Sequence, residues 1–138
     1  MTLLREIMTT NVDYVEPHDN VYEVALKMKE DDVGIIPVCE DGTLIGIITD
    51  RDLVIDGIAE KRPGSTRVTD VMHQNVVTAN PDTSEEEAAA LMAEHQIRRL
   101  PILENGKLVG IVSLGDLAVS YSGTDEAGDA LQDISEQD

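Results

Sequence analysis

A chain of 138 residues with 41% hydrophobic residues, no Trp, no Phe and three Tyr can bury roughly two thirds of its unfolded surface in one compact unit with an aliphatic core. Its net charge of −18 repels nucleic acid and anionic membranes, and it has no apolar stretch of the roughly 18 residues that a membrane span needs. With no secretory signal in residues 1–10 and a single Cys39, which cannot form an internal disulfide, the sequence predicts a cytoplasmic protein.

The first half of the chain predicts a strand, a helix, a hairpin and a second helix. Val12–Val15 is a short β-rich segment, and the apolar residues of the next segment recur at helical spacing after Asn20, with Glu23 as the reciprocal capping partner. Apolar runs at 35–39 and 44–48 flank an Asp-Gly turn, which is a strong hairpin signal. A helix is expected from about residue 50, and residues 56–67 are predicted to be a polar linker.

The second half repeats this order. A β-rich segment at 76–79 precedes a helix capped by Ser84 and Glu87, and apolar runs at 100–103 and 108–112 flank an Asn-Gly turn. Another helix is expected from about Leu114. The tail, residues 122–138, holds six acids and no base, and it is predicted to be disordered or a marginal helix.

The two halves are internal repeats. Shifted by 64 residues, the chain matches itself without a gap from Leu4 to Leu53, with 16 identical pairs in 50 positions. The identical pairs include Met8/Met72, Pro37/Pro101, Gly46/Gly110 and Asp52/Asp116. We therefore expect a mixed α/β (α+β) fold of two β-α-β-β-α repeats, at residues 1–55 and 68–121.

The excess of acids has two interpretations. Adaptation to a high-salt cytoplasm is the favoured one, because the acids are spread over the whole chain and Lys is scarce. Salt would screen the repulsion that otherwise opposes folding of such a chain. An ordinary acidic protein is the alternative.

Three groups of residues, each present twice, resemble a known family. They are Ile7-Met8-Thr9 with Val71-Met72, Ile36-Pro37-Val38 with Leu100-Pro101-Ile102, and the segments 46–53 and 110–117. In order, spacing and duplication the chain resembles a tandem pair of cystathionine-β-synthase (CBS) domains, also called a Bateman module, over about residues 4–121. The resemblance implies two repeats packed through their sheets as a pseudo-twofold pair, with two clefts that bind AMP, ADP, ATP or S-adenosylmethionine. It also implies pairing of two modules into a homodimer.

The candidate ribose site is a Thr/Ser-x-x-Asp motif at the start of the last helix of each repeat. Thr49 with Asp52, and Ser113 with Asp116, could simply be a helix cap with an acid in the first turn, where the helix dipole favours it. In a CBS-like frame each carboxylate would instead accept hydrogen bonds from the ribose hydroxyls, and the helix N-terminus would face the phosphate. Both interpretations can hold together.

The resemblance also suggests contacts for adenine and phosphate, which could alternatively be core residues and surface ion pairs. Adenine would lie against residues of the opposite repeat, which in the Asp116 cleft are Val12, Val33, Gly34 and Ile36 and in the Asp52 cleft are Val76, Ile97 and Pro101. Candidate phosphate contacts are Arg98, Arg99 and Arg51. Since the first repeat has Gly34 and Ile35 where the second has the two arginines, the clefts should differ. We expect the Asp116 cleft, with Arg99, to prefer the phosphorylated ligand.

No pattern of catalysis or metal binding is present. The three His residues follow no metal-ligand spacing, and no nucleophile–base pair or Gly-rich phosphate loop occurs. We therefore expect a non-catalytic module without a cofactor that signals to an unidentified protein target. A protein-interaction scaffold with empty clefts and an enzyme that turns over ATP or AMP are the rivals. The expected homodimer face carries four apolar residues of the helices after positions 50 and 114, namely Leu53, Val54, Leu117 and Ala118.

Overall fold

The computed structural model describes residues 1–121, which form two compact units. Unit 1 combines Met1–Val12 with the chain from Val77 onward, and unit 2 is Asp13–Val76. These units do not coincide with the sequence repeats, because the first twelve residues join the body of the second repeat and residues 68–76 join the body of the first. The predicted tail at 122–138 lies outside the described residues.

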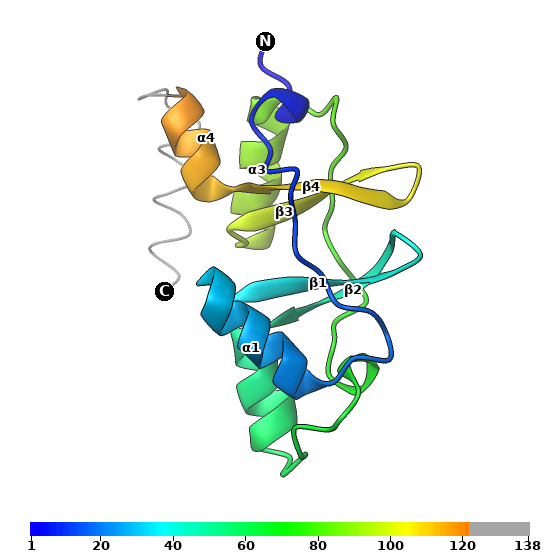
Figure 1. Cartoon of the computed structure of the whole chain (residues 1–138). Helices are drawn as coiled ribbons and strands as arrows, with labels where there is room; N and C mark the ends of the chain where they lie inside the picture. The colour runs from blue at the N-terminus through cyan, green and yellow to red at the C-terminus, as the bar shows by residue number, and fades with distance from the viewer. Residues whose placement is uncertain (122–138) are drawn as a thin grey trace. The chain divides into compact units, whose positions relative to one another are not determined.

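Unit 2 consists of a helix, a β-hairpin and a helical segment that follows it. Its elements are α1 (Val21–Asp31), β1 (Ile35–Glu40), β2 (Thr43–Thr49), α2 (Asp50–Asp52), the π-helix η2 (Leu53–Ile58) and the 3-10 turn η3 (Val68–Asp70). The predicted cap is confirmed, since Asn20 Oδ1 accepts a hydrogen bond of 2.9 Å from Glu23 N. Helix α1 contacts both β1 and η2 (Figure 1).

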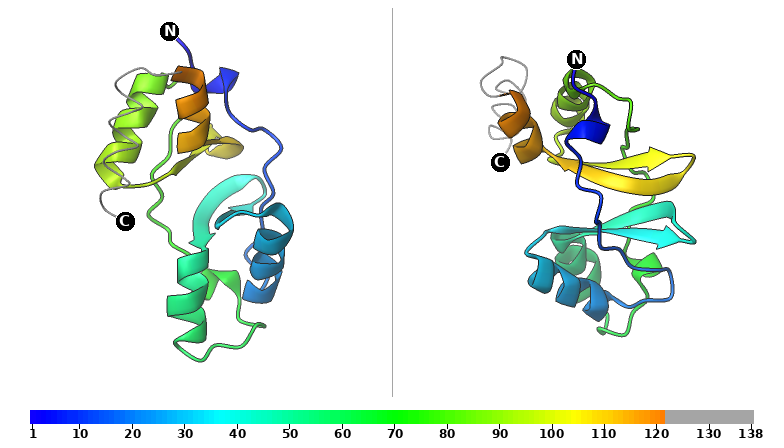
Figure 2. Two further views of the ribbon diagram at one scale, coloured as in Figure 1. Left: turned by 90° about the vertical axis from the view of Figure 1, so that its left-hand side faces the viewer. Right: turned by 45° about the horizontal axis from the view of Figure 1, so that its top comes forward.

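Unit 1 also has a helix, a β-hairpin and a helix in this order, but its 3-10 turn precedes them in the chain. It contains η1 (Leu4–Glu6), α3 (Glu85–His95), β3 (Arg99–Glu104), β4 (Lys107–Ser113) and α4 (Leu114–Tyr121). Ser84 Oγ accepts a hydrogen bond from Glu87 N, as predicted. Figure 2 shows α3 on one face of the β3–β4 hairpin, with α4 at the end of β4. None of the helices within residues 1–121 is both long and apolar enough to cross a membrane.

Both hairpins turn as predicted. In unit 2, Asp41 and Gly42 have φ of 51° and 83°, and in unit 1 Asn105 and Gly106 have 55° and 80°. Two successive residues at positive φ are the requirement of a type I′ turn, which Asp-Gly and Asn-Gly meet with little strain. The antiparallel register then places Ile36 opposite Ile48 and, in unit 1, Leu100 opposite Val112, and these four side chains are buried.

Each hairpin is flanked by short segments rather than by the full strands predicted at 12–15 and 76–79. Val15 forms a single parallel bridge to Val38, and Ala79 forms the same bridge to Ile102. Only one residue of each segment pairs because the chain turns away at the following proline, which has no N–H to donate. The prediction of a first strand in each repeat is therefore correct in place but too long.

Each core is completed by a residue from the other sequence repeat. Leu4 of η1 is fully buried among residues of α3, β3 and α4, and Val68 of η3 is fully buried among residues of α1, β1 and β2. The helices packed against each hairpin leave part of its apolar face for this residue to cover. The unit boundaries follow from this exchange.

Two further predictions were wrong in detail. The helix after β2 continues to Ile58, whereas a linker was predicted from residue 56. Gly57 lies within this π-helix and does not have a positive φ. Leu117, predicted on a dimer face, is fully buried in the core of unit 1, while Val119 of the same helix is exposed.

Candidate functional site

The Thr49–Asp52 pair in unit 2 forms a closed capping box. Asp52 Oδ2 accepts a hydrogen bond of 2.8 Å from Thr49 N, and Thr49 Oγ1 accepts one of 3.2 Å from Asp52 N. The strand β2 ends at this threonine and helix α2 begins after it, so the box fixes the carboxylate at a helix N-terminus. Asp52 is only 4% exposed. The capping interpretation is thus correct, and it leaves the second carboxylate oxygen available to another partner.

That partner is His73, whose Nε2 is in close polar contact with Asp52 Oδ1. The imidazole is held there by the backbone, because His73 N donates to Ile47 O at 2.8 Å and Ile47 N donates to His73 O at 2.9 Å. The side chain of His73 remains 57% exposed. Both oxygens of the Asp52 carboxylate are therefore engaged within unit 2.

Unit 1 repeats the capping box without the imidazole. Asp116 Oδ2 accepts a hydrogen bond of 2.8 Å from Ser113 N, and Ser113 Oγ accepts one of 3.0 Å from Asp116 N. Thr9 takes the place of the histidine, with the same pair of backbone hydrogen bonds to Ile111 at 2.9 Å each. Asp116 is partly buried. The two sites share their geometry but differ at this position.

The arginine pair lies beside the Ser113 site. Arg99 begins β3 and is the direct cross-strand partner of Ser113, so the two side chains emerge on the same face of the hairpin. Arg98 O accepts a hydrogen bond of 2.7 Å from Leu114 N, which ties the arginine segment to the start of α4. In unit 2 the partner of Thr49 is Ile35. A cation therefore neighbours the hydroxyl in unit 1, where unit 2 has an apolar side chain.

Arg51 of unit 2 is exposed on the first turn after Thr49. Its backbone N donates a hydrogen bond of 2.9 Å to Asp50 Oδ1. Gly34 lies against the same aspartate, because Asp50 N donates a hydrogen bond of 2.9 Å to Gly34 O. A Cβ on Gly34 would be 3.2 Å from Asp50 Oδ2. An acid therefore lies beside Gly34.

The predicted site residues divide between the units. Unit 2 brings together Thr49, Arg51 and Asp52 with Val33, Gly34, Ile36 and Val76, and unit 1 brings together Ser113, Asp116, Arg98 and Arg99 with Val12, Ile97 and Pro101. Ile36 is 2% exposed and Pro101 is buried, so both side chains contribute to the interior. The pairing of Asp116 with Val33, Gly34 and Ile36, and of Asp52 with Ile97 and Pro101, remains a prediction.

His73 is the residue that sequence reasoning missed. At the level of sequence it was considered only with the other two histidines, as a metal ligand without the required spacing, and in the repeat alignment it stands opposite Thr9. Its meaning depends on the packing of residues 68–76 onto β2, which no local pattern shows. Within residues 1–121, no group of three or more His, Cys, Asp or Glu side chains lies close enough to hold a metal ion.

The two sites lie in two copies of one known domain. The sequence model of the CBS domain matches this chain twice, at residues 4–55 and 68–123. The chain belongs to the CBS domain family. This CBS pair is 52% identical over 140 residues to the uncharacterized protein YlbB of Bacillus subtilis, and the match covers 100% of this chain and 95% of YlbB.

Solved structures share the CBS fold. The structure of CBSX2 in complex with AMP matches with a TM-score of 0.78 and 27% sequence identity. The match covers 88% of this chain and 97% of the CBSX2 chain. The structure of Hypoxic Response Protein I with two coordinated zinc ions matches with a TM-score of 0.79 and 34% sequence identity. This match covers 87% of this chain and 99% of the other chain. The tandem CBS fold expected from the sequence is thereby confirmed. The comparisons do not support a halophilic origin.

Proposed function

We propose that this CBS pair is a non-catalytic regulatory module that binds an adenosine nucleotide. The observation that carries the proposal is the duplicated capping box, in which Asp52 and Asp116 are each fixed by two hydrogen bonds at the end of a strand. The capping box engages one oxygen of each carboxylate, so the other oxygen of Asp116 can accept hydrogen bonds from the hydroxyls of a ribose, whereas that of Asp52 is contacted by His73. The helix N-terminus beside each carboxylate favours an anion. The AMP complex of the related CBSX2 agrees with this ligand class.

Arg99 supports a phosphorylated ligand at the Asp116 site. It lies opposite Ser113 on β3, so a phosphate near the hydroxyl would be within reach of a guanidinium. Such a contact matters in this protein because the net charge of −18 repels anions from most of the surface. AMP, ADP, ATP and S-adenosylmethionine all remain candidates, with the phosphorylated ones favoured at Asp116.

The test compares adenosine with 2′-deoxyadenosine by isothermal titration calorimetry. Loss of one hydroxyl leaves a buried acceptor unpaired, which costs about 1–3 kcal/mol, so the deoxy compound should bind roughly tenfold or more weakly. Asp52→Asn and Asp116→Asn together should remove this discrimination. Asp82→Asn is the control for each single substitution, since Asp82 is an exposed acid and its replacement also removes one negative charge. Equal affinity of wild type for both nucleosides would contradict the ribose role.

The principal alternative is a protein-interaction scaffold that binds no nucleotide. It would be favoured if a folded protein bound none of AMP, ADP, ATP, NAD and S-adenosylmethionine in calorimetry. The enzymatic alternative requires turnover of ATP or AMP, which chromatography of the nucleotide after long incubation would detect. In either case the fold alone does not decide the function.

We also propose that the module forms a homodimer through an apolar helical surface. Large exposed apolar side chains of unit 2 gather on α1 and η2, which contact each other, and they are Tyr22, Leu26, Val54, Ile55 and Ile58. Burial of such side chains is the usual driving force of association. Light scattering should give about 30 kDa, twice the chain mass of 15.0 kDa. A mass of one chain at micromolar concentration would contradict the proposal.

A further inference from the structure

The Asp52 carboxylate differs from that of Asp116 because both of its oxygens already contact a partner within the protein. Its Oδ2 accepts the Thr49 N–H, and its Oδ1 is paired with His73 Nε2. Because Asp52 is only 4% exposed with both partners in place, a ribose diol has little access to either carboxylate oxygen until one partner leaves. The Thr49 N–H is fixed in the backbone, so the imidazole is the partner that a ligand would have to displace.

The imidazole can leave without unfolding its segment. His73 is anchored by two backbone hydrogen bonds to Ile47, which are independent of the ring, while its side chain is 57% exposed and can rotate outward. At the equivalent position of unit 1, Thr9 is anchored to Ile111 in the same way. The difference between the two sites at this position is therefore confined to a side chain.

We propose that His73 is an internal competitor that closes the Asp52 carboxylate to ribose and makes the Asp52 site the weaker of the two. This inference rests on the proposed function. A ligand must first open the contact between His73 and Asp52, so its apparent affinity is the intrinsic affinity multiplied by the fraction of molecules in which this contact is open. A hydrogen bond to a charged group is strong enough to lower the affinity by roughly tenfold or more. His73 is thus a specificity-determining residue that makes the affinities of the two sites unequal.

The experiment uses adenosine, which has no phosphate and so leaves the arginines out of the comparison. Calorimetry is done in the Asp116→Asn background, in which the other site has lost its carboxylate, so that an effect of His73 is measured at the Asp52 site. We expect His73→Thr, which installs the residue of the equivalent position, to tighten adenosine binding roughly tenfold. His95→Thr is the matched control, because it replaces an exposed histidine at the end of α3 and should change nothing.

A second variant and a second readout protect the test against misfolding. His73→Gln keeps a neutral donor of similar reach, and it should give a smaller gain than threonine. The imidazole signals of His73 in NMR should shift when adenosine saturates the Asp116→Asn protein, because the ring loses its carboxylate. Circular dichroism melting verifies that each variant is folded.

The outcomes separate this inference from the proposed function. If the Asp116→Asn protein binds adenosine and both His73 variants bind it equally or more weakly, the competitor role is overturned while nucleotide binding stands. If wild type binds adenosine but the Asp116→Asn/His73→Thr protein shows no binding, the inference is again overturned, since opening the carboxylate did not create a site. If wild type binds no adenosyl compound, the proposed function fails as well.

Discussion

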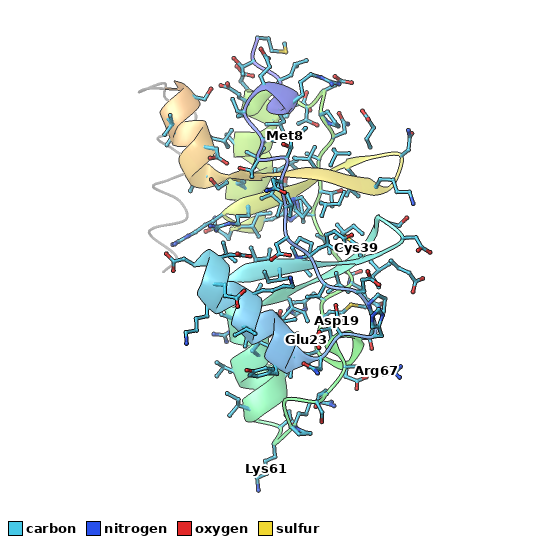
Figure 3. The ribbon with its side chains drawn as sticks, viewed as in Figure 1. Met8, Asp19, Glu23, Cys39, Lys61 and Arg67 are labelled. Carbon is cyan, nitrogen blue, oxygen red and sulfur yellow. The ribbon has the colours of Figure 1, made fainter. Side chains whose placement is uncertain are left out.

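The sulfur of Met8, a residue labelled in Figure 3, lies 2.7 Å from the position that a Cβ would take on Gly110. The backbone oxygen of Thr9 lies 2.9 Å from the same position. Gly46 has the same relationship to residues of the other repeat, with His73 O at 2.7 Å and Met72 Sδ at 2.8 Å. Each glycine is identical in the two repeats because a backbone segment crosses directly over it. The absence of a side chain lets the segment pair with the hairpin.

Alanine at either of these glycines should therefore destabilise the fold. The nearest backbone oxygen cannot move without breaking the bridge, so we expect Gly46→Ala and Gly110→Ala each to cost about 1–3 kcal/mol in urea unfolding. Gly57→Ala is the control, because a Cβ there meets nothing within 4 Å and the helical backbone favours alanine by about 0.5–1 kcal/mol. A loss of stability in the control equal to that of the other two would contradict the close-approach explanation.

The exchange of segments predicts which fragments fold. Residues 13–76 contain every member of the unit 2 core, including Val68, whereas residues 1–64 have the same length but lack Val68 and expose Leu4. We expect cooperative thermal unfolding, followed by circular dichroism, only for the fragment 13–76. A unit of this size is marginally stable, so losing one fully buried Val is decisive. Cooperative unfolding of 1–64 at an equal or higher temperature would contradict this prediction.

Arg99 should affect phosphate binding and not nucleoside binding. We expect Arg99→Ala to weaken AMP about tenfold or more through loss of a charge-assisted contact and to leave adenosine nearly unchanged. The readout is calorimetry in the Asp52→Asn background, which isolates the Asp116 site. Arg67→Ala, at an exposed arginine of unit 2, controls for the change in net charge. Equal weakening of AMP and adenosine would indicate that Arg99 supports the fold.

Cys39 should be unreactive in the folded protein. It is 1% exposed on β1, and burial raises the pKa of its thiol to about 11 from its ordinary value of 9.0 (Figure 3). At pH 8 the native protein should resist a thiol reagent that labels it at once in urea. Since the folded state holds the proton where the unfolded state releases it, stability should fall as pH rises between about 9 and 11, by about 2–3 kcal/mol.

The control for this pH effect is Cys39→Ala, which removes the titrating thiol. Its stability should be lower than that of wild type at neutral pH but should lack this part of the decline above pH 9. Rapid labelling of native Cys39 at pH 8, or an identical decline in the alanine variant, would contradict the assignment.

Salt should stabilise this protein at low ionic strength. Between ~10 and ~100 mM KCl the Debye length shortens from about 30 to about 10 Å, so repulsion among 28 acids with only 10 bases is largely screened in that range. We expect the melting temperature to rise steeply over this range and to level off above it. A melting temperature that stays constant from ~10 mM to molar KCl would show that the excess of acids carries no penalty.

Local patterns in the sequence determined the helices, hairpins and turns of this protein. The Asn20 and Ser84 caps, the Asp-Gly and Asn-Gly turns and the alternation of apolar residues each act over a few neighbouring positions, so a linear reading is sufficient. The capping boxes of Asp52 and Asp116 were predictable for the same reason, since they span three residues.

Only the tertiary structure decided how the repeats exchange segments and what the carboxylates contact. Leu4 and Val68 each complete the core of the other repeat, where they cover apolar surface that the helices of that repeat leave open. The same exchange carries His73 to Asp52, twenty-one residues away along the chain, and leaves Thr9 at the matching place in unit 1. A side chain that acts through long-range packing leaves no periodic or spacing signal, so the inequality of the two sites could be read only from the folded molecule.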